Sequence, residues 1–156
     1  MTSEDDKERW ERIRLILNKD RQAMLNAWNS MDDPVEAMRH GLRTEKFTAF
    51  EFLLLHCDDE LNKSVFDMLV DHASVAHGCI HKNRAIIKMM SRKWVIEHIE
   101  PIVNHILTDE TDAEEYYTRF AELYSELDDG LLNRLLDRAA QHDNPAVVEI
   151  SEDYRA

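Results

Sequence analysis

The chain has 156 residues and a formal net charge of -13, a length that suits one domain. Its three glycines and three prolines are too few for glycine-rich phosphate loops, dinucleotide-binding folds or hairpin-rich β-sandwiches. Hydrophobic residues make up 44% and charged residues 33%, which excludes a disordered chain and a membrane-spanning one. We therefore expect one acidic, all-α domain over residues 1–156.

The N-terminal segment, residues 1–31, is predicted to form an amphipathic helix over about residues 4–30. Trp10, Ile13, Leu17 and Met24 recur at the three-to-four spacing of one helix face. The sequence Asp-Asp-Pro at 32–34 ends this helix and begins a short one, because proline suits the first turn of a helix.

Residues 32–150 are predicted to form a series of helical hairpins, followed by a tail over residues 151–156. Asp58, Asp128 and Asn144-Pro145 are typical helix starts, because their side chains can accept a hydrogen bond from the first turn. We expect helices over 44–57, 59–73, 85–90, 94–106, 112–127 and 129–140, with a short one from 145. Pro101 either kinks its helix or marks a new first turn.

An internal period of about 33 residues relates these helices. Apolar residues recur at this spacing in several columns, namely Leu54/Ile87/Phe120, Phe66/Ile99/Leu132, Leu69/Ile102/Leu135, Val70/Val103/Leu136 and Ala73/Ile106/Ala139. The period favours stacked antiparallel helical hairpins, a short α-solenoid. The alternative is a compact antiparallel helical bundle.

Some segments resemble known helical repeats. Residues 69–75 (LVDHASV) and 135–141 (LLDRAAQ) are similar to second helices of ankyrin-type repeats, although that family's turn glycines are missing. The helix entry at residues 143–148 (DNPAVV) is similar to HEAT-like repeats. The resemblance covers about residues 33–150 and implies a helical solenoid fragment whose concave face binds another macromolecule. It assigns no functional residue.

The acidic charge is concentrated toward the C-terminus. Residues 109–156 hold 14 acidic and four basic residues, a net charge of -10, which repels phosphate backbones and attracts cationic partners. We therefore predict a non-catalytic protein–protein interaction module that binds a basic protein and does not bind nucleic acid directly. A more specific version of this prediction is an inhibitor or immunity-type protein. Its predicted partner-binding residues are Asp109, Glu110, Asp112, Glu114, Glu115, Tyr117 and Tyr124.

One stretch is basic instead. Five basic residues lie in a segment that contains no acidic residue, and three of them share a helix face. The five are Lys82, Arg84, Lys88, Arg92 and Lys93. We expect this face to pair with acidic parts of the same molecule or with an acidic partner.

Imidazole and thiol groups gather at His72, His77, Cys79 and His81, residue types that bind zinc. Their spacing fits no standard zinc pattern, so we predict no metal and no cofactor. The alternative function is a metal-binding or catalytic helical domain centred on this cluster. Cys57, beside His56 on a predicted helix, is expected to pack in the core, and we predict that the chain is not an enzyme.

The two cysteines are too few for a disulfide framework, and the first residues are acidic, unlike a signal or transit peptide. No window approaches 18 apolar residues. We therefore expect a cytoplasmic protein that does not enter a membrane.

Overall fold

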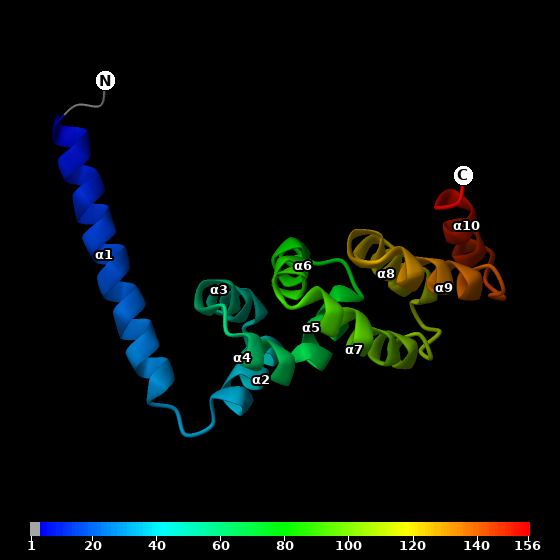
Figure 1. The fold of residues 1–156 in the computed structure, drawn as a ribbon, viewed down its shortest axis with the longest axis horizontal. Helices are drawn as coiled ribbons and strands as arrows, with labels where there is room; N and C mark the ends of the chain where they lie inside the picture. Colours follow the sequence, from blue (N-terminus) through cyan, green and yellow to red (C-terminus); the bar gives the residue numbers. More distant parts are fainter. Residues whose placement is uncertain (1–3) are drawn as a thin grey trace. The chain divides into compact units, whose positions relative to one another are not determined.

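A computed structural model describes residues 4–156, and of the side chains those from residue 7 onward (Figure 1). The described residues form ten helices and no strand, which confirms the all-α prediction. The chain divides into two compact units, Met1–Ala37 and Met38–Ala156. None of the helices in the described part is long and apolar enough to cross a membrane.

The first unit consists of α1, Glu4–Asn29, and the beginning of α2, Pro34–Thr44. α1 begins and ends close to the predicted positions, and α2 begins at the predicted proline. The Asp33 side chain accepts a hydrogen bond from the Glu36 backbone N–H at 2.9 Å, which explains locally why α2 starts here. The predicted apolar face of α1 is largely exposed, with Trp10 64% and Leu17 61% accessible.

The second unit holds the remaining helices. They are α3 (Lys46–His56), α4 (Asp59–Ser64), α5 (Phe66–Ala73), α6 (Ile80–Met89), α7 (Arg92–Ile106), α8 (Ala113–Leu127), α9 (Asp129–Ala139) and α10 (Pro145–Asp153). Three of the predicted caps form: Asp58 accepts hydrogen bonds at the start of α4, Asp128 at α9 and Asn144 at α10. The single helix expected over 59–73 is instead interrupted at Val65, and Pro101 lies inside a continuous α7.

Three pairs of helices one period apart contact each other in this unit. α3 contacts α6, α8 contacts α10, and α5 contacts α7. The periodic apolar columns contribute to the core, because Leu69, Val70, Val103, Leu136 and Ala139 are all buried. Most of the apolar positions that repeat along the sequence therefore belong to the core, with Ile102 and Ile106 of α7 among the exceptions.

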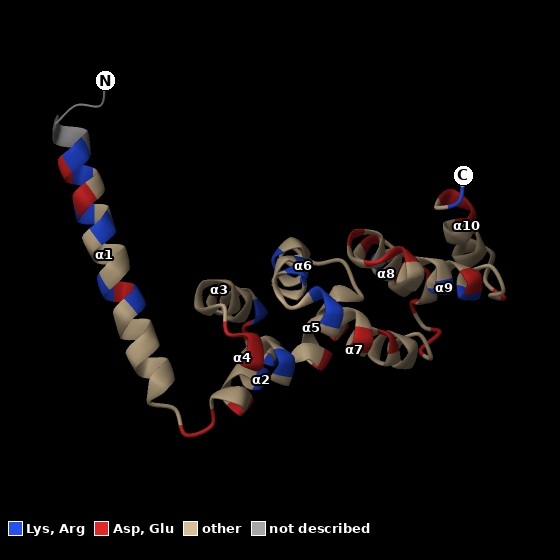
Figure 2. Cartoon of the chain, in the orientation of Figure 1, with Lys and Arg blue, Asp and Glu red and all other residues tan. Residues whose placement is uncertain are grey.

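Basic residues are concentrated on α6 (Figure 2). Ion pairs to neighbouring helices account for them. Lys82 pairs with Glu51 of α3, and Lys88 pairs with Glu126 of α8. Arg84 pairs with Glu122 of α8 at 2.6 Å. The expectation that this face pairs with acidic parts of the same molecule is confirmed.

Two local predictions are wrong. The tail expected from residue 151 begins later, because α10 continues to Asp153 and Ser151 is buried, with its hydroxyl donating to the Val148 carbonyl at 2.8 Å. Cys57 is exposed rather than packed in the core. α3 ends at His56, and Cys57 follows it in the left-handed region at φ 53°, which turns its side chain away from the buried face.

Candidate functional site

The predicted acidic site lies on the turn before α8 and on its first helical turn. Asp109 accepts a hydrogen bond from the Thr111 backbone N–H at 2.9 Å, which shapes this turn. Hydrogen bonds from Thr111 and, more weakly, from the Tyr116 hydroxyl hold the pKa of Asp109 below its usual value. Asp112 precedes the helix without bonding to its N–H groups, so the Asp112 carboxylate is not used as a cap.

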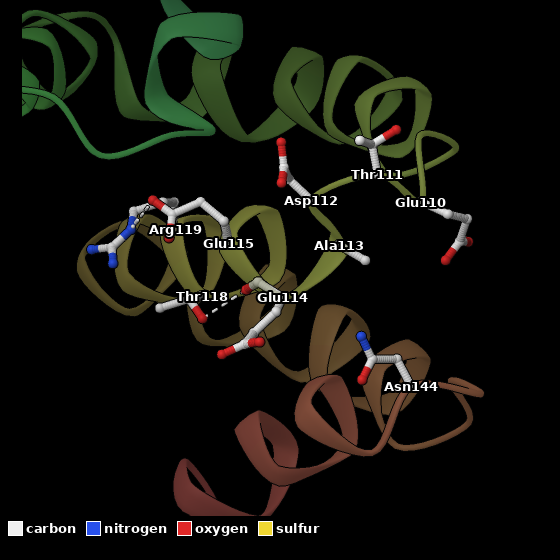
Figure 3. Close-up of a pocket in the computed structure, with 9 residues that line it drawn as sticks. All are labelled: Glu110, Thr111, Asp112, Ala113, Glu114, Glu115, Thr118, Arg119 and Asn144. Atoms are coloured by element: carbon white, nitrogen blue, oxygen red, sulfur yellow. Dashed lines mark hydrogen bonds and ion pairs between the residues drawn. The ribbon is translucent and has the colours of Figure 1, made fainter.

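These residues surround an open hollow of 470 Å³ (Figure 3). It is lined by Glu110, Thr111, Asp112, Ala113, Glu114, Glu115, Thr118, Arg119 and Asn144. Four of the nine side chains are carboxylates and one is a guanidinium. The hollow is therefore a site of negative potential, of the kind that concentrates cationic ligands.

Two of the four carboxylates are engaged in structural contacts. Glu115 accepts hydrogen bonds from the Arg119 side chain at 3.0 Å and from the Ala76 backbone N–H at 2.7 Å, which ties α8 to the loop after α5. Glu110 lies 3.1 Å from the His142 imidazole. Each of these carboxylates therefore has a role in holding the fold.

Asp112 and Glu114 differ from them. Within residues 7–156 neither carboxylate has a hydrogen bond or an ion pair. Arg119, the one basic side chain that lines the hollow, is held by Glu115 and also by Glu122 at 2.8 Å. Two negative charges are thus available to an external cation.

The tyrosines predicted for this surface are not on it. Tyr117 and Tyr124 are each only 1% exposed, so placing them among the partner-binding residues is wrong. Both point into the core against other helices, where Tyr117 packs edge-on against the His142 ring. The neighbouring Tyr116 is half-buried, and its hydroxyl donates to Asp109 at 3.5 Å.

The histidine and cysteine cluster is a hydrogen-bonded structural corner. The His72 ring bonds to the Leu42 carbonyl at 3.0 Å, and the His77 Nε2 to the His72 carbonyl at 2.9 Å. A carbonyl only accepts, so His77 carries its proton on Nε2, and its Nδ1 accepts from the Cys79 backbone N–H at 3.3 Å. Burial lowers the pKa of both His72 and His77.

This corner offers no metal centre. In the described part of the chain no three His, Cys, Asp or Glu side chains are grouped so that they could hold an ion. His81, the fourth predicted member, is exposed on the first turn of α6. Cys79 is only 4% exposed and its Sγ lies 3.3 Å from His77 Nδ1. The metal-binding form of the alternative function therefore has no set of ligands among the described residues, and its catalytic form stays a prediction.

Sequence reasoning missed the contribution of α10 to the hollow. Asn144, the residue that caps α10, lines the hollow with α8 although it lies 30 positions beyond Glu114 in the sequence. Its capping role has a clear sequence signal, but its position beside α8 has none.

No family model, no curated protein and no solved structure matches this chain.

Proposed function

We propose that this chain is a non-catalytic interaction module that binds a basic protein through the acidic hollow at the start of α8. The observation that carries the proposal is the pair of unengaged carboxylates, Asp112 and Glu114, in a hollow whose one lining arginine is already paired. A lysine or arginine from a partner would form ion pairs with these two carboxylates. Charge-assisted hydrogen bonds of this kind are stronger than neutral ones.

The chemistry of the hollow favours a protein partner over a nucleic acid. Carboxylates repel phosphate, and α10 adds three acidic residues and no Lys or Arg, whereas the acidic and basic residues of α9 balance. Such a surface speeds the encounter with a basic protein and selects it over others. An inhibitor or immunity-type protein would use it to occupy the phosphate-binding surface of a basic enzyme.

The architecture that we propose beneath this surface is a stack of helical hairpins. The contacts between helices one period apart support this interpretation, and so do the ion pairs that link α3 to α6 and α6 to α8. A stack of this kind would hold the start of α8 in a fixed place, so that its carboxylates meet a partner without reordering.

The test uses a fluorescent lysine- and alanine-rich peptide of about 15–20 residues and fluorescence anisotropy. The site variant is Asp112→Lys with Glu114→Lys. The control is Asp32→Lys with Glu45→Lys, which makes the same change in net charge at exposed acidic residues outside the hollow. We expect the site variant to weaken binding about tenfold more than the control, since two close charge pairs are lost.

Salt gives a second criterion. Binding to the wild type should weaken markedly between low salt and about 0.15 M, because mobile ions screen exposed charges. If both double variants weaken binding equally, the peptide senses only net charge, and the assignment of the hollow is wrong.

A further inference from the structure

A second hollow lies between α5 and α7 and is chemically different from the acidic one. It has a volume of 260 Å³ and is lined by Asp67, Met68, Asp71, Ile102, His105 and Ile106. Met68, Ile102 and Ile106 make its apolar part, and we call it the α5–α7 slot. Its volume suits one large side chain and is below the usual range for small-molecule sites, about 300–1,000 Å³.

The slot interrupts the periodic packing. Ile102 and Ile106 are partly exposed, whereas the residues one period before and after them are buried. Those buried equivalents are Leu69, Leu135, Ala73 and Ala139. Two positions that form core in the neighbouring helices therefore present apolar surface on α7.

The edge of the slot is acidic. Asp67 and Asp71 are exposed and lie one turn apart on α5. Asp67 is bound by Arg39 at 2.9 Å, while the Asp71 side chain has no ion pair in the part of the chain that the structure describes. His105 is the basic group on the α7 side.

The acidic edge is connected electrostatically to the acidic hollow. α5 contacts α8, and besides burial the charges of Asp112, in the hollow, and of Asp71, at the slot, both raise the pKa of Tyr116. The loop after α5 is fastened to Glu115 of the acidic hollow through the Ala76 N–H. The apolar slot and the acidic hollow therefore share one negatively charged region of the second unit.

We propose that the α5–α7 slot receives one large apolar side chain from a helical segment of a basic protein, with Lys or Arg of that segment held by Asp71. This inference rests on the proposed function and names the partner's binding element. A groove between two helices suits an amphipathic helix, and a buried anchor side chain carries much of the energy in such complexes. The acidic edge excludes anionic lipid headgroups and nucleic acid.

The experiment compares three fluorescent peptides of about 15–20 residues that are rich in alanine to favour helix. The anchored peptide carries lysines and one tryptophan, the anchorless peptide has serine in place of that tryptophan, and the third has glutamates in place of the lysines. We expect the anchored peptide to bind the full-length protein about tenfold or more tightly than the anchorless one, as one buried anchor implies.

Variants locate the effect. Ile102→Ser should remove the advantage of the anchored peptide, while the matched control Ile80→Ser, at another partly exposed isoleucine, should keep it. Met68→Trp, which fills the slot from within, should act like Ile102→Ser. Methyl NMR of the wild-type protein tests the same contact without a substitution. The methyl signals of Met68, Ile102 and Ile106 should shift when the anchored peptide is added, and the Ile80 signal should not.

The outcomes separate the two proposals. Equal affinities for the anchored and anchorless peptides, or methyl shifts only outside the slot, would overturn the slot and leave the acidic hollow standing. If neither lysine peptide binds better than the glutamate peptide, both proposals are wrong.

Discussion

Three isoleucines on α7 allow the packing to be tested within one helix. Ile99 is completely buried, whereas Ile102 and Ile106 are partly exposed at the slot. Substituting each by alanine makes the same chemical change on the same element. The gain in helix propensity, about 0.4 kcal/mol, is therefore common to all three variants and cancels in the comparison.

The expected magnitudes follow from burial. Ile99→Ala removes three buried carbon atoms at about 0.8 kcal/mol each and leaves a cavity, so we expect a loss of about 3–4 kcal/mol in the free energy of unfolding. Ile102→Ala removes atoms that are already partly in water and leaves no closed cavity. We expect a loss of about 1 kcal/mol or less there, and a similar loss at Ile106.

Urea unfolding followed by circular dichroism at the helix band measures these differences. With a slope of about 1–3 kcal/mol per molar urea, the midpoint for Ile99→Ala should lie about 1 M or more below that of Ile102→Ala. An equal slope in the three variants shows that they unfold from comparable states. Equal midpoints for Ile99→Ala and Ile102→Ala would refute both the periodic core and the open slot.

Four further predictions concern local stability and pH. Cys57→Gly should raise the free energy of unfolding by about 0.5–1 kcal/mol, because glycine adopts the left-handed conformation at φ 53° without the Cβ clash; a lower urea midpoint would contradict this. Gly41→Ala should stabilise α2 by a similar amount, about 0.5–1 kcal/mol, since an added Cβ would meet only Ala49 at 3.6 Å; thermal unfolding checks it, and a lower Tm would disprove it. Asp128→Ala removes the cap on the Leu131 N–H and should cost about 1 kcal/mol, with Asp129→Ala as the neighbouring control; equal losses in the two would count against the cap. Burial lowers the pKa of His72 and His77 in the folded state, so protonation of these residues favours unfolding. The stability present above the unfolded pKa of about 6.5 should therefore be lost as the pH falls below it. The double variant His72→Gln with His77→Gln should lose less stability over this pH range, and an unchanged pH dependence of unfolding in the variant would refute this cause.

The features that the sequence predicted well are those that depend on neighbouring residues. The caps at Asp58, Asp128 and Asn144 each involve a hydrogen bond to an N–H two or three residues ahead, so a short stretch of sequence contains both partners. The acidic segment before α8 was likewise visible from composition, and four of its five predicted acidic residues, all but Asp109, line the hollow.

The features that it predicted poorly depend on contacts between distant segments. Tyr117 and Tyr124 lie seven residues apart on one helix face, and helical spacing shows that they share a face without showing what covers it. The packing of other helices against α8 buries them. Likewise, Ile102 belongs to an apolar column whose other members are buried, and only the spacing between α5 and α7 leaves it partly exposed.

Sequence alone therefore determined the helical class, most helix starts, the apolar period and the location of the acidic charge, because these follow from hydrogen bonds and side-chain spacing within a few turns of chain. Only the tertiary structure decided which apolar faces are covered, which carboxylates are engaged and which remain available. Asp112 and Glu114 are chemically like Glu115 in the sequence, and what distinguishes them is that, of the three, only Glu115 is bound by the Ala76 N–H and by Arg119. Such contacts depend on how the helices pack, which no single segment encodes.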